Sequence, residues 1–485
     1  MRKTIFLAIL AVLVVAMPAF ASVNNIKVSG SVDSTWLNRA NFDLGANTIG
    51  DETQSLGITQ TMVQVDAELT ENVSTTVCLI NERAWNAKGT SAAGDDMNIH
   101  YAYATLREML YSPLTVVVGR QAFKYGNSFV VDSTGTNNSA PTDSGLALVA
   151  GDLTKQTAQD AVRLIFDYNP LTLELLFSKV DANLNTLIPD NDDDIDLYGL
   201  NASYELGDAW ATMVEGYFFA KIAKADTAAV PFNHADKVYV PGLRASTNPI
   251  EGLNLQGEFA WQGGNRALTT TAFAGAVATF YDRNQRRNAI GAQIIANYQV
   301  PVLEEYKPTA EYVYTYVSGD RNPSLTPQAS VIGSTPASGE GYNAWDPMFE
   351  NQGGGKIYNA IFNLSNMQIH SASFSVSPIE DVITKFSWTG LWLDKKLDAT
   401  TFALVQPDGP NATASVNRNE EDLGFELDFD AVYDYTEDVQ IGASLGWFLP
   451  GDVFENVSSA TAVANATNIS DDIASQALVH MNVNF

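Results

Sequence analysis

The chain has 485 residues and is strongly acidic: 56 Asp and Glu residues stand against 27 Lys and Arg residues, giving a formal net charge of −29 at pH 7. This charge argues against a nucleic-acid partner. Cys78 is the only cysteine, which excludes an intrachain disulfide and a thiolate cluster, and the four histidines are too scattered to predict a zinc site.

The first residues have the pattern of an export signal. Arg2 and Lys3 precede an apolar run that ends near Met17, and Ala19-Phe20-Ala21 supplies a small-residue cleavage pattern. A retained membrane anchor is the alternative, but the run is shorter than the roughly 20 apolar residues that a spanning helix needs. We therefore expect a signal peptide at residues 1–21 and one β-barrel domain at 22–485.

Alternating polarity recurs along the rest of the chain, punctuated by clusters of Gly, Asn, Asp and Pro that are typical of hairpins. This pattern predicts an all-β fold of about 18 strands, with 16 as the alternative count, and an even number suits a closed antiparallel transmembrane barrel. The expected strands are 26–39, 53–69, 73–86, 97–107, 114–120, 160–168, 171–181, 195–206, 209–222, 237–247, 252–263, 286–299, 308–319, 366–377, 381–394, 421–433, 438–449 and 476–485.

One face of many predicted strands is polar throughout, which favours a water-filled barrel over a soluble β-sandwich with an apolar core. Asn254, Gln256 and Glu258 alternate with Leu255 and Phe259. The final segment alternates in the same way and ends at an aromatic residue. We expect lipid outside and water inside, and hence a bacterial outer-membrane location.

Connections between the predicted strands alternate in length, as expected for short periplasmic turns and long external loops. Asn169-Pro170 and Gly207-Asp208 predict tight turns, whereas 121–159 and 320–365 are long and polar. The segment 121–159 could fold into the lumen as a constricting loop; an external loop is the alternative.

Strand alternation also assigns basic side chains to the lumen. In 160–168 an apolar face at Val162 and Leu164 sends Arg163 inward, and similar arguments apply to 286–299 and 381–394. Arg83, Arg120 and Arg244 lie on segments in which both faces carry apolar residues or the strand end is unclear. The expected pore-lining cations are Arg83, Arg120, Arg163, Arg244, Arg287 and Lys385.

Acidic side chains are expected on the inner face as well, where they would make one wall of the lumen negative. Separated charges in a narrow channel select and orient charged solutes. Each charge could instead pair with its neighbours and only hold the wall together. The expected pore-lining acids are Asp66, Glu68, Glu258, Glu311, Glu426 and Asp428.

The segment Val117-Val118-Gly119-Arg120-Gln121-Ala122-Phe123-Lys124-Tyr125-Gly126 resembles the Gly-Arg-Gln and Tyr-Gly pattern of the alginate-export family of outer-membrane porins. The resemblance implies a single 18-stranded barrel with a basic constriction for an anionic polysaccharide. It assigns Arg120 to that constriction and makes Gly119, Gln121, Tyr125 and Gly126 neighbours that position the following loop. The chain departs from the family just afterwards, at Asn127-Ser128-Phe129.

These patterns predict a passive channel for hydrophilic charged solutes, with export of an anionic polysaccharide as a specialised form. The alternative is a barrel-anchored structural or adhesive surface protein, whose acidic stretch from Asp190 to Asp194 could bind Ca²⁺. The sequence has no Gly-x-Ser-x-Gly elbow, and Gly353-Gly354-Gly355-Lys356 lacks phosphate-loop spacing, so no enzyme and no cofactor are expected. The expected partners are outer-membrane lipid and small hydrophilic or anionic solutes; the oligomeric state stays open.

Overall fold

The computed structural model describes most of the chain. The described residues are 25–45, 53–85, 97–111, 113–135, 146, 149–181, 194–224, 235–274, 277–320, 341–352, 355–397, 401–404, 412–455 and 471–485. The expected signal peptide at 1–21 lies outside them, as does the acidic run at 190–193.

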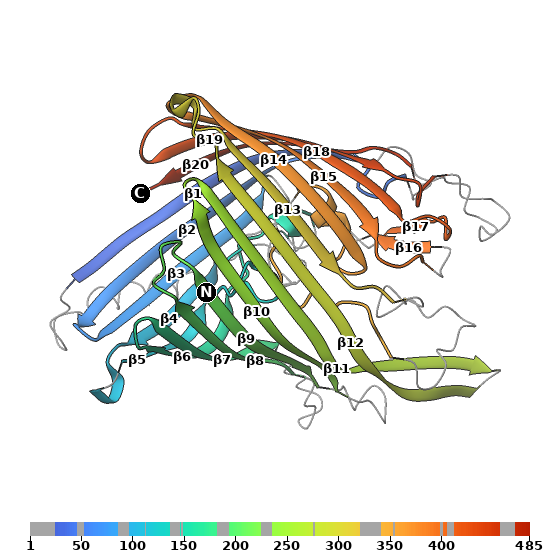
Figure 1. The fold of residues 1–485 in the computed structure, drawn as a ribbon, viewed down its shortest axis with the longest axis horizontal. Coiled ribbons are helices and arrows are strands. Elements are labelled where there is room, and N and C mark those ends of the chain that lie inside the picture. Colours follow the sequence, from blue (N-terminus) through green and yellow to red (C-terminus); the bar gives the residue numbers. More distant parts are fainter. Residues whose placement is uncertain are drawn as a thin grey trace, which may run out of the picture.

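The described chain forms an 18-stranded antiparallel sheet (Figure 1). Its strands are β1 (Asn25–Ala40), β2 (Thr53–Thr70), β3 (Val73–Ala84), β4 (Asn98–Leu106), β5 (Leu114–Gln121), β6 (Gln159–Asp167), β7 (Leu171–Asp181), β8 (Ile195–Glu205), β9 (Met213–Ala223), β10 (Asp236–Ile250), β11 (Leu253–Ala274), β12 (Val277–Gln299), β13 (Thr309–Val317), β14 (Met367–Ile379), β15 (Val382–Leu393), β18 (Asp422–Asp434), β19 (Val439–Pro450) and β20 (Ala474–Asn484).

Pairing between the first and last strands closes this sheet into a barrel. β1 pairs with β20 from Ser31 opposite Asn484 to Ala40 opposite Ser475, and it pairs with β2 on its other side. Closure leaves no strand edge exposed to hydrocarbon. The predicted closed barrel of 18 strands is therefore confirmed.

Two features differ from the predicted strand boundaries. β11 and β12 remain paired as far as Ala274 and Val277, well past the expected ends at 263 and 286, and project as a ribbon beyond their neighbours (Figure 1). A separate small hairpin, β16 (Thr401–Leu404) with β17 (Ala412–Ser415), was not expected. Gly, Thr and Asn residues in the extended parts of β11 and β12 mimic loop punctuation in the sequence.

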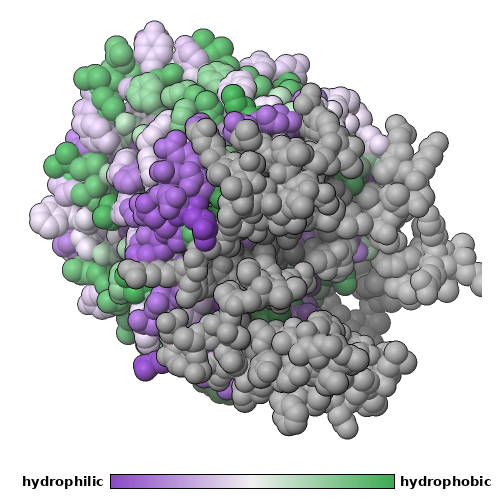
Figure 2. Space-filling view, turned by 90° about the vertical axis from the view of Figure 1, so that its right-hand side faces the viewer, coloured by the Kyte–Doolittle hydropathy of each residue, from purple (hydrophilic) through white to green (hydrophobic). Residues whose placement is uncertain are grey.

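The wall of the barrel alternates as a transmembrane barrel requires. On β2, Val63 and Val65 are exposed on the outer face, whereas Gln60 has the opposite parity and is buried on the inner face. Figure 2 shows mostly green and pale side chains on the coloured outer surface, with hydrophilic side chains near the border with the grey atoms. Within the described chain, no helix has the length and hydropathy to cross a membrane.

Chain segments that fold into the barrel cover much of its inner wall. The first inward segment comprises the described residues 122–135, 146 and 149–158 between β5 and β6, and the second comprises 341–352 and 355–366 between β13 and β14. They carry η3 (Gly151–Leu153) and α2 (Tyr358–Ile361), while η2 (Met109–Tyr111) and η4 (Glu304–Tyr306) lie in other connections. Phe129 and Trp345 join an apolar cluster that also contains the wall residues Leu197, Phe219 and Val240.

Candidate functional site in the lumen

The first inward segment is held to the wall at its Tyr-Gly pair. The Tyr125 hydroxyl donates a short hydrogen bond to Glu174 of β7, and Arg163 of β6 places its Nε 2.5 Å from Oε1 of the same carboxylate. All three side chains are largely buried. Arg163 therefore does lie on the inner face, but its charge is paired with a carboxylate that anchors the loop.

The next two residues of this segment are fixed through their backbone. The Gly126 N–H donates to Glu215 at 3.1 Å, and the Asn127 N–H donates to Glu258 at 2.7 Å. Arg244 lies 3.5 Å from Glu215 and also donates to Gln256 at 2.8 Å. Buried carboxylates need such partners because an unpaired buried charge is costly.

The later part of the first inward segment is anchored on β3 by one carboxylate. Glu82 accepts hydrogen bonds from Thr154 Oγ1 at 2.6 Å, the Lys155 N–H at 2.7 Å and Gln156 Nε2 at 2.9 Å. Gln60 of β2 donates to the same carboxylate at 2.6 Å. The segment 121–159 therefore has described parts at both ends that line the lumen wall.

The second inward segment is anchored by Glu426 of β18. Its carboxylate accepts the backbone N–H groups of Lys356, Ile357 and Tyr358 at 2.5, 2.9 and 2.7 Å. Asp428, two residues farther along β18, is buried beside it. Glu426, an expected pore-lining acid, therefore holds the chain that narrows the pore, which is a structural role that alternation alone does not reveal.

The two inward segments are also joined to each other. The Asp132 N–H donates to the Phe349 carbonyl at 2.8 Å, and the Asn351 N–H donates to the Ser128 carbonyl at 2.9 Å. The Phe129 and Trp345 rings stack with centroids 5.3 Å apart. The two inward segments thus form one hydrogen-bonded unit inside the lumen. This unit is anchored to β7, β9 and β11 on one side and to β18 on the other.

A buried ionic cluster around Asp346 ties the second inward segment to the opposite wall. Asp346 contacts Lys221 of β9 at 2.6 Å and Arg287 of β12 at 3.4 Å, and Arg287 also bonds Asp236 at 2.7 Å. Burial by itself would raise the pKa of the Asp346 carboxyl, but Lys221 and Arg287 lower it to about 2. Arg287 is therefore an inner-face cation with two carboxylate partners.

A less buried set of charges follows the rest of the inner wall, and we call it the charged arc. Lys385 of β15 lies 3.7 Å from Glu311 of β13, and Lys356 lies 3.4 Å from Asp430 of β18. Lys155 pairs with Asp33 of β1. The charged arc therefore consists of Glu311, Lys385, Asp430, Lys356, Asp33 and Lys155.

His480 of β20 lies between the Lys356–Asp430 pair and the Lys155–Asp33 pair of the charged arc. It is close enough to interact electrostatically with Asp33, Lys155, Lys356 and Asp430. A Cβ at Gly442 of β19 would lie 2.0 Å from the His480 ring, so the imidazole packs directly over this glycine and would have to shift if a side chain were added there. The two inward segments thus bring lysines from distant parts of the chain to one region of the wall.

In each pair of the charged arc, the cation is more exposed than its carboxylate. The exposed fractions of the side chains are 34% for Lys155 against 10% for Asp33, 41% for Lys356 against 21% for Asp430, and 43% for Lys385 against 33% for Glu311. The lysine side chains of the charged arc are therefore more accessible than the carboxylate side chains that pair with them.

Two expected pore-lining arginines lie elsewhere. Arg83 of β3 is exposed and stands opposite Thr59 of β2 in the strand register. Its side chain has the parity of the exposed Val77, which is that of the outer face. Arg120 shares the outward parity of Val118, and its Nη1 lies 3.3 Å from the exposed Asp160. Valines occupy both faces of β5, and both Val116 and Val117 are buried, so alternation could not assign this strand.

The remaining expected residues divide between the inner wall and the motif. Asp66 accepts hydrogen bonds from Gln64 at 2.8 Å and Thr76 at 2.6 Å, and Glu68 shares its parity but is exposed near the strand end. Gln121 donates to the Gly119 and Ala161 carbonyls at 3.1 and 3.0 Å. The motif residues therefore shape the start of the first inward segment.

Several residues of the site were missed by the sequence argument: Asp33, Glu82, Lys155, Glu174, Glu215, Lys221, Asp346 and Lys356. Glu174 and Glu215 do alternate with exposed apolar residues on their strands, so parity could have found them. Lys155 and Lys356 lie in long connections, where no periodicity places a side chain.

Within the described chain, no group of three or more His, Cys, Asp or Glu side chains is arranged to hold a metal ion. The acidic stretch expected as a Ca²⁺ site is described only at Asp194, which forms an ion pair with Lys179 at 2.5 Å.

Comparisons with known proteins agree with this architecture. The family model described as "Alginate export" matches residues 26–467. Among solved structures, the outer membrane protein OpdK of Pseudomonas aeruginosa is similar, with 8% identity and a TM-score of 0.53 over 96% of this chain and 99% of that one. OccAB1 of Acinetobacter baumannii has 9% identity and a TM-score of 0.53 over 96% and 98%.

A third similar structure is OccK2 (OpdF) of Pseudomonas aeruginosa, solved in complex with glucuronate, with 10% identity and a TM-score of 0.52 over 96% of this chain and 99% of that one. No curated protein matches the chain. At these identities the solved structures establish the barrel fold, and the family match rests on the sequence itself.

Proposed function

The chain belongs to the alginate export family, and we propose that its outer-membrane channel favours anionic, hydrophilic solutes at the charged arc. The family and the fold are those of porins and export channels. They give no support to the alternative of a barrel-anchored adhesive protein. Export of an anionic polysaccharide is the specialised form of this function that the family suggests.

The observation that carries the proposal is the order of exposure in the charged arc. The side chains of Lys155, Lys356 and Lys385 are each more exposed than the side chain of the paired carboxylate residue. In contrast, Arg163 and Arg287 are largely enclosed by their partners. A positive surface in a narrow, low-dielectric passage raises the local concentration of anions.

The carboxylates in the charged arc give the passage a second property. Asp33, Asp430 and Glu311 can accept hydrogen bonds from hydroxyl groups while the neighbouring lysines contact a carboxylate. A uronate carries both kinds of group on one ring. The glucuronate bound to the similar OccK2 barrel supports this class of solute, although it is a different protein.

The proposal includes the processing and orientation of the chain. Removal of residues 1–21 would leave the barrel to insert from the periplasm, as expected from the export signal. The short connections at Asn169-Pro170 and Gly252 would face the periplasm, and the long ones the outside. Both inward segments then descend from the external end.

Blockage of single channels by sugars tests the proposed solute class. The refolded barrel in a planar bilayer should show current interruptions with glucuronate and longer uronates but not with glucose at the same concentration. Exchange of Lys155 and Lys356 for Gln should shorten the interruptions, whereas Arg83→Gln, which removes an exposed outward cation, should not. Equal blockage by charged and neutral sugars would contradict the proposal.

A further inference from the structure

Two tyrosines of β4, Tyr101 and Tyr103, face the lumen because of a bulge in the strand. The register between β3 and β4 shifts by one residue between Ile99 and Tyr101. Ile99 is exposed on the outer face, whereas Tyr101 stands opposite Cys78, which is buried on the inner face. His100 is the additional residue of the bulge, and without it alternation would turn both tyrosines to the lipid.

Polar side chains surround the second tyrosine. Tyr103 stands opposite Thr76 of β3, which in turn stands opposite Asp66 of β2 and donates a hydrogen bond to it at 2.6 Å. Gln64 donates to the same carboxylate at 2.8 Å. The tyrosines of an aromatic girdle point outward at the lipid boundary. Tyr103 and its neighbours belong instead to the water-filled side of the wall.

The two tyrosine rings are held in place without being fully covered, and we call them the tyrosine platform. The Tyr101 ring packs on the ring of the buried His100, with centroids 3.9 Å apart. The Tyr101 and Tyr103 centroids lie 6.4 Å apart at an interplanar angle of 69°, so the two rings do not stack face to face. Both residues are partly exposed. The tyrosine platform therefore presents fixed aromatic surface to the lumen.

The tyrosine platform lies beside the first inward segment, toward the end of the barrel that has short connections. Asn98 of β4 donates to Gln156 of that segment at 3.0 Å, and Lys155 of the charged arc is the preceding residue. Tyr101 follows Asn98 by three residues, or roughly 10 Å along an extended strand. β4 then runs into the short connection 107–113. A solute that enters from this end therefore meets the tyrosine platform before Lys155.

Aromatic and polar groups together fit the surface of a sugar ring. The faces of a pyranose carry C–H groups, which pack on the negative face of an aromatic ring, and its edge carries hydroxyl groups. Asp66 and Gln64 beside the platform offer polar atoms that can bond hydroxyl groups. A small anion without a ring gains nothing from an aromatic face. The tyrosine platform therefore favours pyranose rings over anions in general.

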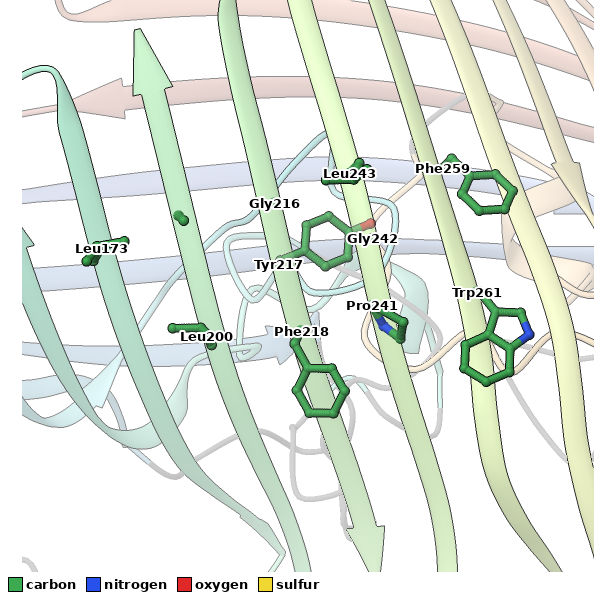
Figure 3. A pocket seen from close by; sticks show the side chains of 11 residues that line it. Leu173, Leu200, Gly216, Tyr217, Phe218, Pro241, Gly242, Leu243, Phe259 and Trp261 are labelled. Carbon is green, nitrogen blue, oxygen red and sulfur yellow. The ribbon is translucent and has the colours of Figure 1, made fainter.

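The pocket on the outer wall is not an alternative site for such a solute (Figure 3). It crosses β7 to β11 with a volume of about 520 Å³ and is bordered by exposed apolar side chains such as Phe218. The Tyr217 hydroxyl donates to Glu258 at 2.6 Å, and the Trp261 indole N–H donates to Asn288 at 2.9 Å. The polar side chains of this pocket thus already have protein partners, and its surface faces hydrocarbon.

We propose that the tyrosine platform is a stacking subsite for one pyranose ring of an acidic saccharide, with a carboxylate of the same saccharide bound at Lys155. This inference rests on the proposed function and narrows its solute class to chains of uronate units. A chain of several units is long enough to occupy both positions at once, whereas a single ring is not. Two linked contacts hold a solute longer than either contact alone.

Single-channel blockage by two trivalent anions tests this subsite. The probes are trigalacturonate, which has three pyranose rings and three carboxylates, and citrate, which has three carboxylates and no ring. Added on the side of the short connections, trigalacturonate should block the wild type for longer than citrate does. Replacing both Tyr101 and Tyr103 by Leu should shorten the trigalacturonate blockages about tenfold, the effect of losing two aromatic contacts, and leave the citrate blockages unchanged.

Matched variants separate stacking from other effects of a substitution. Tyr101→Phe keeps the ring and should retain most of the trigalacturonate blockage. Tyr198→Leu removes an exposed tyrosine from the outer wall and should change neither blockage. Citrate contacts the charged arc alone, so an unchanged citrate blockage in the double Leu variant also shows that the barrel is folded and its lysines are in place.

Three results would overturn the inference. Trigalacturonate blockages of equal length in the wild type and the double Leu variant would show that the tyrosines do not contact the saccharide. Equal shortening of the trigalacturonate and citrate blockages would assign the change to the pore as a whole. Both of these results leave the anion preference of the charged arc standing, whereas a wild type that neither anion blocks would overturn the proposed function as well.

Discussion

Gly126 lies so close to Glu258 that a Cβ on Gly126 would be 2.6 Å from the Glu258 Oε1 atom. The backbone of Gly126 also has a φ of +59°, in the region that favours glycine. This contact explains why the Tyr-Gly pair ends in glycine: the chain can approach the carboxylates of β9 and β11 only without a side chain.

Replacing Gly126 by Ala should loosen the first inward segment. The new methyl group would displace Glu258, and the left-handed backbone would cost roughly 1–2 kcal/mol in addition. We expect a larger and noisier single-channel conductance from a barrel that still folds. Gly257→Ala is the control, because its added methyl group has open space; unchanged conductance in Gly126→Ala would contradict this account.

Replacing Glu426 by Gln should release the second inward segment. The carboxylate accepts three backbone N–H groups, and an amide has only one oxygen with which to replace it. Leaving buried donors unpaired costs about 1–3 kcal/mol each. Protease cleavage near residues 355–366 should become faster in the folded barrel, whereas Glu68→Gln, at an exposed site, should leave the cleavage rate at the wild-type value.

The packing of the constriction should weaken above neutral pH. Burial raises the pKa of Glu350 to about 7, with a further contribution from the charge of Asp132. A raised pKa means that Glu350 stabilises the folded segment fully below its unfolded pKa of about 4.3, and this stability is lost as pH rises through 7. Open-channel noise should therefore increase between pH 6 and 8.

Glu350→Gln provides the check on this pH effect. The amide is uncharged at every pH, so the noise of this variant should stay at its low-pH level throughout the range. If the wild type and Glu350→Gln respond to pH in the same way, another group is responsible.

The two arginines from neighbouring strands should differ in their effect on stability. Arg163 is paired with the buried Glu174, and removing one partner of such a pair costs about 3–5 kcal/mol. The more exposed pair between Arg120 and Asp160 should contribute at most about 1 kcal/mol. Urea unfolding of the refolded barrel should give Arg163→Gln a clearly lower free energy of unfolding than Arg120→Gln. Equal losses of stability in the two variants would contradict these assignments.

Alternation with a period of two was sufficient to predict the barrel, because lipid outside and water inside impose it on every strand. The inward orientation of the Glu258 and Lys385 side chains follows directly from this alternation. Alternation fails on β3 and β5, where inner-face residues such as Ile80 and Val117 are apolar and buried, so that both faces of these strands read as apolar. Arg83 and Arg120 were therefore assigned to the wrong face.

The roles of the inner-face charges could not be predicted for a related reason. Glu426 and Glu258 have the pattern of pore-lining acids, but their partners are backbone N–H groups of segments about 70 and 131 residues away in the chain. Lys155 and Lys356 enter the charged arc from long connections, whose path depends on these same contacts. Only the folded chain brings them together.

The reversal potential of the open channel under a salt gradient tests the central claim most directly. We predict anion preference in the wild type and in Arg83→Gln, and a shift toward cation preference when Lys155, Lys356 and Lys385 are all replaced by Gln, because the carboxylates Asp33, Asp430 and Glu311 would remain. A wild-type channel that prefers cations, or a triple variant with an unchanged reversal potential, would contradict the account.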